Sequence, residues 1–223
     1  MEQIIKVSYK STSNPYQANK FLQEIKQHNI MACDFEVATK YLPAELGSLQ
    51  QELDNNPAKR RSIEIQSILK ATALDHPSHT QLTHCSIATN DHEGYVFILD
   101  NKRITDLVLT FLTTTTIRQV WHNASYDFRQ IRYRTKKFPL LYEDTQILAK
   151  TILNHADVTQ ALSGLKHLVG HRYGAWGISA DQFTLEQMYD PTMLLYAATD
   201  ACACYYLWDS IQQYIKDNSV REA

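Results

Sequence analysis

The chain has 223 residues and a net charge of −2, and 44% of its residues are hydrophobic. These values are ordinary for a globular protein with one sizeable core. A charge so close to zero excludes a global field that attracts polyanions, so nucleic-acid binding would need a local basic patch or bound metal. The chain has no signal peptide and no apolar run of the roughly 20 residues that cross a bilayer. We therefore expect a cytoplasmic protein without membrane contact (in the host cytoplasm if the source is a virus).

Cysteine and histidine residues give no sign of a soft-metal site. The four cysteines form no Cys-x-x-Cys pair, and they are Cys33, Cys85, Cys202 and Cys204. Two of them are two positions apart on a predicted helix and so face different ways, which makes a poor metal pair. We predict buried, reduced thiols. The histidines of segment 76–79 and His84 have no cysteine or acidic partner at ligand spacing, which predicts surface or loop histidines.

Strand signals come early in the chain, and helix signals dominate its second half. Strands are predicted over residues 3–9, 31–37, 82–88, 94–99 and 118–121, and the third and fourth of them form a hairpin. Helices are predicted over residues 104–112, 123–134, 144–153, 162–169 and 190–215. Asn14-Pro15 and Asp190-Pro191 each supply a cap followed by a first-turn proline, and Gly170 is the predicted end of the 162–169 helix. This order predicts an α/β layered domain.

Two carboxylates interrupt the apolar strand 31–37. Side chains alternate along a strand, so Asp34 and Glu36 point to one face while Cys33 and Phe35 point to the other. Two buried carboxylates side by side repel each other and need a cation or a wet edge. An isolated Asp-x-Glu is equally compatible with the fraying end of a strand, so the interpretation depends on acids elsewhere in the chain.

Two later segments carry acids in similar surroundings. Asn123 and Asp127 are four residues apart after a strand, so both can face the same way on the first turns of a helix. Tyr196 and Asp200 have the same spacing within the apolar C-terminal helix. The alternatives are an asparagine cap with an acid favoured by the helix dipole, and an exposed aspartate on a polar stripe. The small residues that would let this last helix approach a sheet closely are Ala197, Ala198, Ala201 and Ala203.

Together, these three motifs resemble the exonuclease motifs of the DnaQ-like 3′–5′ exonucleases, in the branch that carries a tyrosine. Segments 143–148 and 162–168 are also similar to the proofreading domain of DNA polymerase I and to ribonuclease D. The resemblance covers most of the chain outside about 38–80. It implies a ribonuclease H-like fold, with a mixed five-stranded sheet flanked by helices. It also implies a single exonuclease domain over residues 1–223, with a helical insertion at about 41–78 after the first acidic strand.

The resemblance implies catalysis by two divalent cations, Mg²⁺ or Mn²⁺, for which carboxylates are suitable hard ligands. By resemblance Asp34 bridges both ions, Glu36 and Asp200 complete the first site, and Asp127 holds the second through water. Tyr196 orients the attacking water, because a phenol with a reference pKa of about 10 is a weak base at neutral pH.

Substrate contacts are expected from one polar residue of the second motif and from two basic runs. Asn123 is expected to contact the substrate or to brace the metal ligands. Residues Lys59, Arg60 and Arg61 form a basic cluster in the insertion, and Arg129 begins a second basic run over 129–137. Each run is also compatible with a solvated helix face.

The predicted function is therefore hydrolysis of phosphodiester bonds at the 3′ end of single-stranded nucleic acid, with release of nucleoside 5′-monophosphates. DNA is the expected polymer, either for a free-standing nuclease or for a proofreading subunit that meets a separately encoded DNA polymerase. One alternative is a ribonuclease D-like enzyme that trims RNA. The other is an inactive module that binds nucleic acid or a protein. An inactive relative is expected to lose one or more acids, and here all four are present.

Overall fold

The computed structural model describes residues 4–39, 43–55, 57–73, 76–152, 163–174, 176 and 185–219. Six strands form one mixed sheet in the order β1-β4-β3-β2-β5-β6. They are β1 (Ser8–Thr12), β2 (Ile30–Thr39), β3 (Thr80–Ala88), β4 (Glu93–Ile98), β5 (Arg118–Trp121) and β6 (Tyr142–Asp144). β3 runs antiparallel to β2 and β4, and the other neighbouring pairs are parallel. The predicted 82–88/94–99 hairpin is confirmed.

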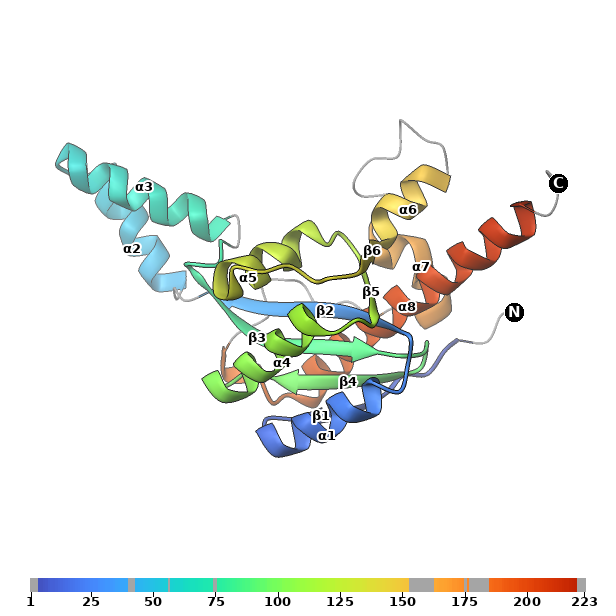
Figure 1. Cartoon of the computed structure of the whole chain (residues 1–223). Helices are drawn as coiled ribbons and strands as arrows, with labels where there is room; N and C mark the ends of the chain where they lie inside the picture. The colour runs from blue at the N-terminus through green and yellow to red at the C-terminus, as the bar shows by residue number, and fades with distance from the viewer. Residues whose placement is uncertain are drawn as a thin grey trace.

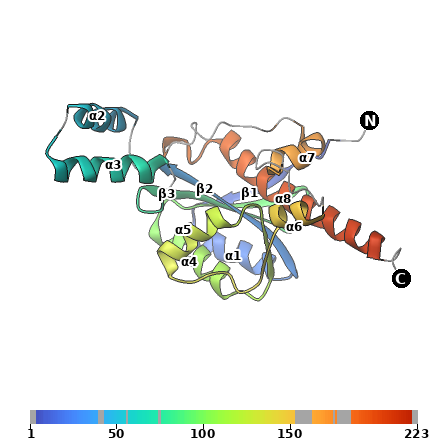
Figure 2. The same ribbon diagram turned by 90° about the horizontal axis from the view of Figure 1, so that it is seen from above.

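Helices cover both faces of the sheet (Figures 1 and 2). The helices on one face are α1 (Pro15–Ile25), α4 (Lys102–Thr114) and α5 (Ser125–Thr135). The helices on the other face are α6 (Thr145–Ile152), α7 (Leu165–Tyr173) and the long α8 (Pro191–Ser219). This arrangement confirms the α/β layered class. None of the described helices is long and apolar enough to cross a lipid bilayer.

Strand β2 divides its side chains between these two layers. Cys33 and Phe35 are buried in the core that also contains the apolar faces of α1 and α4. Because neighbouring residues of a strand point in opposite directions, Asp34 and Glu36 face the layer that contains α8. The four cysteines are buried and free, as predicted.

Helix α8 packs closely on the sheet because small residues meet at the contact. Ala197, Ala198 and Ala201 are fully buried. Gly94 of β4 lies directly below the helix, and a Cβ atom built on it would be 2.9 Å from the Cβ of Ala198. This contact fixes the height of α8 above the sheet, and α8 carries Tyr196 and Asp200. The expected role of its alanines is confirmed.

Replacing Gly94 by alanine is expected to cost about 1–3 kcal/mol of stability, because the added methyl group must push α8 away from the sheet. Cleavage activity should fall further than the loss of folded protein explains, since a misplacement of about 1 Å at a catalytic group can cost roughly 100-fold. Thermal unfolding and kcat at a temperature where the variant is folded test this. Gly47→Ala is the matched control, because a Cβ at this exposed helical position meets nothing within 4 Å. An equal effect of the two substitutions would contradict the prediction.

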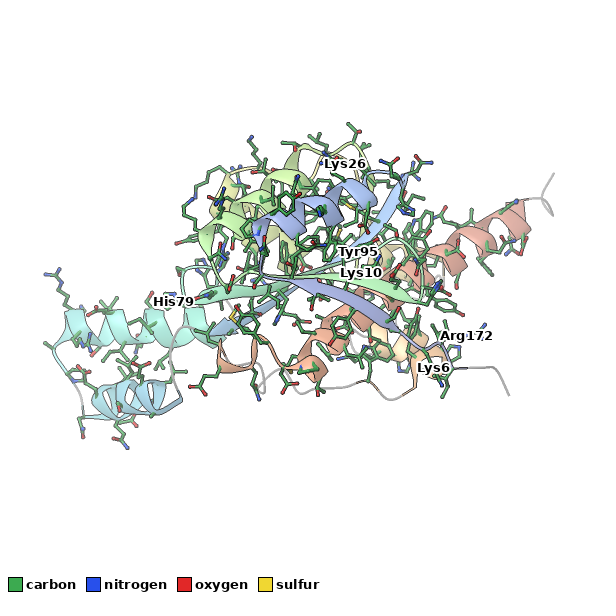
Figure 3. The ribbon with its side chains drawn as sticks, turned by 90° about the horizontal axis from the view of Figure 1, so that it is seen from below. Lys6, Lys10, Lys26, His79, Tyr95 and Arg172 are labelled. Atoms are coloured by element: carbon green, nitrogen blue, oxygen red, sulfur yellow. The ribbon has the colours of Figure 1, made fainter. Side chains whose placement is uncertain are left out.

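Between β2 and β3, two antiparallel helices form an arm that projects from the body (Figure 2). These are α2 (Pro43–Asp54) and α3 (Lys59–Ala73). Both helices lie within the segment at about 41–78 for which a helical insertion was predicted. Arg61 joins the two helices through bonds of 2.7 and 2.9 Å to the carboxylate of Glu52. The start of α3 lies at the far end of the arm, and His79 marks the base where the chain re-enters the sheet (Figure 3).

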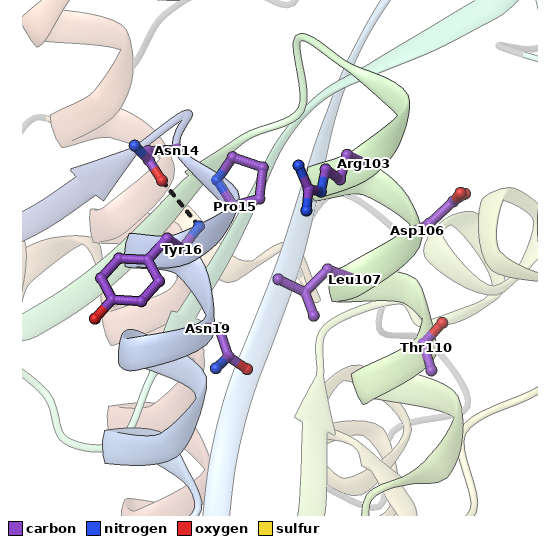
Figure 4. Close-up of a pocket in the computed structure, with 8 residues that line it drawn as sticks. All are labelled: Asn14, Pro15, Tyr16, Asn19, Arg103, Asp106, Leu107 and Thr110. Atoms are coloured by element: carbon purple, nitrogen blue, oxygen red, sulfur yellow. Dashed lines mark hydrogen bonds between the residues drawn. The ribbon is translucent and has the colours of Figure 1, made fainter.

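Helix α1 begins as predicted, with Asn14 as its cap. The Asn14 side chain accepts the backbone N–H of Tyr16 at 2.8 Å (Figure 4). Asp190 caps α8 in the same way, accepting the N–H of Thr192 at 2.7 Å. A hollow of about 680 Å³ lies between α1 and α4. Figure 4 shows the residues that line it, Arg103 and Asp106 among them. The hollow lies on the sheet face opposite α8 and so away from the acidic residues of β2.

Three predictions about single elements are wrong. The sheet has six strands instead of five, because the three residues of β6 are too few to show a periodicity. Residues 4–7 precede β1, and there Ile5 donates its N–H to the carbonyl of Arg172 at 2.7 Å instead of joining the sheet. Helix α7 continues past Gly170 to Tyr173. Gly174 follows with a φ of 72° and a ψ of −162°, a backbone conformation that glycine tolerates and that does not continue a helix.

His84 is also placed differently from the prediction. It is fully buried in β3 instead of lying in a surface loop. Its Nε2 lies 2.8 Å from the carbonyl oxygen of Met188, which ties the strand to the segment before α8. Burial lowers the pKa of His84, so this imidazole is a neutral core group.

Candidate active site

Three of the predicted acids meet between β2 and α8. Each of Asp34, Glu36 and Asp200 offers a carboxylate oxygen, and these oxygens all lie within 4.8 Å of one another. The strand places the first two on one face, and the close packing of α8 brings the third to them. The structure therefore brings together residues that are more than 160 positions apart in the chain.

Asp127 approaches the same strand from the first turn of α5. Its side chain is 2% exposed, and its Oδ1 accepts the backbone N–H of Phe35 at 3.1 Å. Phe35 lies between Asp34 and Glu36 in the chain, so this bond holds the fourth acid beside the other three. One carboxylate oxygen of Asp127 is thus occupied by the backbone, which fits a ligand that acts through water.

The electrostatics of the four acids favour a bound cation. Burial, followed by repulsion from neighbouring carboxylates, raises the pKa values of Asp34 and Glu36 well above their usual range. Burial raises the pKa of Asp127 to about 8, although the Phe35 N–H opposes this shift. Burial also raises the pKa of Asp200. A cluster of hard oxygen ligands that repel one another is suited to Mg²⁺ or Mn²⁺, which would neutralise the charges and favour the ionised forms.

A chain of hydrogen bonds surrounds the α8 end of this acidic cluster. Lys166 of α7 donates to the hydroxyl oxygen of Tyr196 at 2.7 Å and lies 4.3 Å from its ring centroid. Tyr196 is hydrogen-bonded to Asp200, and the indole N–H of Trp176 donates to Asp200 Oδ1 at 2.5 Å. Burial and then the nearby Asp200 raise the pKa of Tyr196, so its phenol stays protonated at neutral pH.

Lys166 and Trp176 are residues that the sequence analysis did not single out. Lys166 lies within the segment similar to ribonuclease D, but neither its type nor its spacing connects it to a tyrosine 30 positions away. Because Lys166 faces Glu36 and Asp200, its charge lowers the pKa of both carboxyl groups. It is thus a positive charge that the chain supplies to Glu36 and Asp200.

Replacing Lys166 by methionine is expected to lower activity at neutral pH by roughly 10–100-fold, the usual effect of losing a group that supports metal ligands. Without this charge the pKa values of Glu36 and Asp200 rise. The acidic limb of the pH–rate profile should therefore move to higher pH, and more Mg²⁺ should be needed for half-maximal activity. Lys166→Arg should largely restore both. An unshifted pH–rate profile in the methionine variant would show that Lys166 has only a structural role.

The structure places Asn123 outside the helix. Asn123 has a φ of 57°, and α5 begins at Ser125, so Asn123 and Asp127 do not share a helical face. The carboxylate of Asp144 accepts the backbone N–H groups of Asn123 at 3.1 Å and Ala124 at 2.9 Å. Asp144 also caps α6 and therefore braces the loop that leads to Asp127. Its position at the start of the helix predicted over residues 144–153 is the signal that could have identified it as a cap.

The remaining predicted substrate residues lie in two different places. Lys59 and Arg60 are exposed at the far end of the arm, and Arg61 is bound to Glu52 and Glu64 within the arm. Arg129 is exposed on α5, with its guanidinium 5.6 Å from the ring centroid of Tyr126. Its charge lowers the pKa of Asp127. Of these four residues, Arg129 is thus the one beside the acids.

Comparison with protein families identifies the chain. A family described as 3′–5′ exonuclease matches residues 71–216, which is more than half of the chain. The chain belongs to this 3′–5′ exonuclease family. The family consists of metal-dependent enzymes, and the exonuclease carries Asp127, Tyr196 and Asp200 within the matched segment. Asp34 and Glu36 precede that segment, and the fold brings them to it. The predicted resemblance is confirmed. No curated protein matches the sequence.

Solved structures with the same fold agree with this assignment. The catalytic core of RRP6 from Trypanosoma brucei matches with a TM-score of 0.64 and 12% identity, over 98% of the exonuclease and 51% of RRP6. RNase D from Escherichia coli matches with a TM-score of 0.61 and 13% identity, over 96% and 46% of the respective chains. NrnC from Brucella melitensis matches with a TM-score of 0.57 and 17% identity, over 97% and 84%. The exonuclease spans about half the length of the matched RNase D chain.

Proposed function

We propose that this exonuclease removes nucleoside 5′-monophosphates one at a time from the 3′ end of single-stranded nucleic acid, with two divalent cations as cofactors. The observation that carries the proposal is the convergence of Asp34, Glu36 and Asp200 within 4.8 Å of one another. Their position beside Tyr196 and Asp127 supports it further. The retention of all four acids argues against an inactive binding module.

The residues would divide the reaction among them. Asp34, Glu36 and Asp200 would hold one cation. Asp127 would support a second cation through water, and Asp34 would contribute to both sites. When bound, the two ions supply an activated water and stabilise the leaving 3′ oxygen. Tyr196, which keeps its proton, orients the attacking water by hydrogen bonding and is not the base. A related structure, of Brucella melitensis NrnC, contains bound Mg²⁺, which supports magnesium as the cofactor.

RNA is the polymer that the comparisons favour, which makes the ribonuclease D-like alternative the stronger one. E. coli RNase D is described as an exoribonuclease involved in structured RNA processing, and RNase D from Trypanosoma brucei was solved with RNA U12. NrnC was solved with the dinucleotide pGG. The expectation of DNA rests on the resemblance to the proofreading domain of DNA polymerase I. The comparisons give no support to a polymerase partner, and the proposed substrate is a free 3′ end.

The test is degradation of 5′-labelled single-stranded DNA and RNA of one sequence with Mg²⁺, Mn²⁺ or EDTA. We expect a ladder that shortens from the 3′ end, needs metal and is absent in an Asp34→Ala/Asp200→Ala variant. The polymer that is degraded faster identifies the substrate class. If the folded wild-type protein cleaves neither polymer with either metal, the proposal is wrong and the inactive binding module becomes the preferred function.

A single exonuclease domain over residues 1–223 and a cytoplasmic location remain predictions. The position of the arm between two neighbouring strands of one sheet supports an insertion into one domain. The four buried, unpaired thiols are compatible with a reducing compartment.

A further inference from the structure

Helix α5 carries an excess of positive charge on its exposed side. Arg129 and Arg132 are three residues apart on one face of the helix, and Lys136 is the residue that caps its C-terminal end. No acidic residue occurs between Asp127 and Glu143, although the whole chain has a net charge of −2. Within the part of the chain that the structure describes, no carboxylate forms an ion pair with these three side chains. Arg132 donates to the carbonyl oxygen of Lys136, and Lys136 donates to that of Tyr133, so these groups contact neutral acceptors and their charge is not neutralised by a described acid.

These cations line a shallow, open hollow. The hollow measures about 400 Å³, and its lining residues are His76, Pro77, Arg129, Arg132, Tyr133 and Lys136. None of them is acidic. We call this feature the α5 hollow. One wall comes from helix α5 and the other from the turn that follows the arm.

Aromatic rings lie among the cations in the α5 hollow. Tyr133 is 46% exposed, and its ring lies 6.2 Å from that of His76 in an edge-to-face arrangement. The ammonium group of Lys136 is 5.2 Å from the centroid of Tyr133. A positive groove with an accessible aromatic ring is the arrangement that binds single-stranded nucleic acid, because the cations contact phosphates and the ring stacks on a base.

The α5 hollow is connected to the acidic cluster through one helix. Arg129 lines the hollow and lies two residues after Asp127 on α5. Arg129 is near enough to Asp127 for its charge to lower the pKa of that carboxyl. Arg132 lies about one turn further along α5, and Lys136 directly follows the end of the helix. The nucleotides that precede a 3′ end held at the acids would then run past Arg129 into the hollow.

We propose that the α5 hollow binds the phosphates and one base of a single strand upstream of its 3′ end, so that this exonuclease prefers oligonucleotides longer than a dinucleotide. This inference rests on the proposed function. It distinguishes the substrate class of this chain from dinucleotides such as pGG, the molecule bound to NrnC in its solved structure.

The first test measures binding without cleavage. In the full chain carrying Asp34→Asn, the affinities for fluorescent single-stranded 12-mers of DNA and RNA are measured by anisotropy over a range of KCl concentrations. Arg132→Gln/Lys136→Gln should weaken 12-mer binding about tenfold at low salt. It should also make the slope of log K against log salt shallower by roughly 1.4, which is about 0.7 for each lost phosphate contact. Tyr133→Ala should weaken binding roughly fivefold or more without changing that slope.

The matched control is Lys20→Gln/Lys26→Gln, which removes two exposed charges from α1 and should leave binding unchanged. In the active protein, the ratio of kcat/KM for the 12-mer to kcat/KM for a dinucleotide should fall in the α5 variant only. The inference is overturned if the α5 variant keeps the wild-type salt slope, or if dinucleotide cleavage falls as much as 12-mer cleavage. The binding measurement needs no cleavage, so it still tests this inference if the proposed exonuclease function is wrong.

Discussion

Replacing Asp34 by asparagine is expected to abolish cleavage and, at the same time, to stabilise the metal-free protein. Asp34 contributes an oxygen to the acidic cluster, and the loss of a metal ligand should lower kcat by roughly 1,000-fold or more, equivalent to about 4 kcal/mol. Without metal, the same carboxyl is a buried group beside Glu36, Asp127 and Asp200, which raise its pKa by repulsion. A neutral amide of nearly the same shape removes that repulsion.

The expected gain in stability is about 1–2 kcal/mol, the usual size of an improvement at a site shaped for function. For a chain of this length it corresponds to a rise in Tm of roughly 2–8 °C. The measurements are single-turnover cleavage with Mg²⁺ and thermal unfolding in EDTA. Asp106→Asn is the control, because this exposed carboxylate of α4 pairs with Lys102 at the surface, and it should change neither quantity. If Asp34→Asn lowered the Tm in EDTA, the idea of mutual repulsion in the site would be wrong.

The metal-free protein is expected to lose stability as the pH rises from about 5 to 8, and divalent cations should reverse this loss. Asp127 has a folded pKa of about 8, against an unfolded value of about 3.9. Between these values the folded protein binds more protons than the unfolded chain. The free energy of unfolding therefore falls with increasing pH, by about 1.4 kcal/mol per unit for each retained proton. Asp34 and Glu36 shift in the same direction.

Bound metal needs the ionised carboxylates, so its stabilising effect should increase as the pH rises. At a concentration of about 100 times Kd, Mg²⁺ should add about 2.7 kcal/mol, or roughly 5–11 °C in Tm for a chain of this length. Thermal unfolding at pH 5.5, 7.0 and 8.5, with and without Mg²⁺, measures both effects. The Asp127→Asn variant should show a flatter pH dependence in EDTA. A metal-free Tm that increases with pH over this range would contradict the assigned pKa shifts.

Local signals determined most of the elements and the identity of the acids. The caps Asn14 and Asp190 were predicted correctly because capping depends on hydrogen bonds to the next few residues. The spacing of Asp34 and Glu36 indicated two carboxylates on one strand face, because side chains alternate with a period of two residues that the strand backbone fixes. The order and spacing of the acids along the chain were enough to indicate the exonuclease family.

The tertiary structure decided which groups surround those acids. Lys166 and Trp176 reach Tyr196 and Asp200 from another segment, and no local periodicity connects residues that meet only through folding. The position of Asp144 at the start of a predicted helix indicates a cap, but its bonds to the backbone of Asn123 and Ala124 in the loop before α5 depend on the fold. Gly170 and Gly174 are the same residue type, but only Gly174 has a positive φ, which does not continue the helix. The sequence by itself thus indicated the acids that are proposed to hold metal. The packing of α7 and α8 on the sheet decided which positive charge lies beside these acids, because electrostatic interactions depend on distance in space and not on separation along the chain.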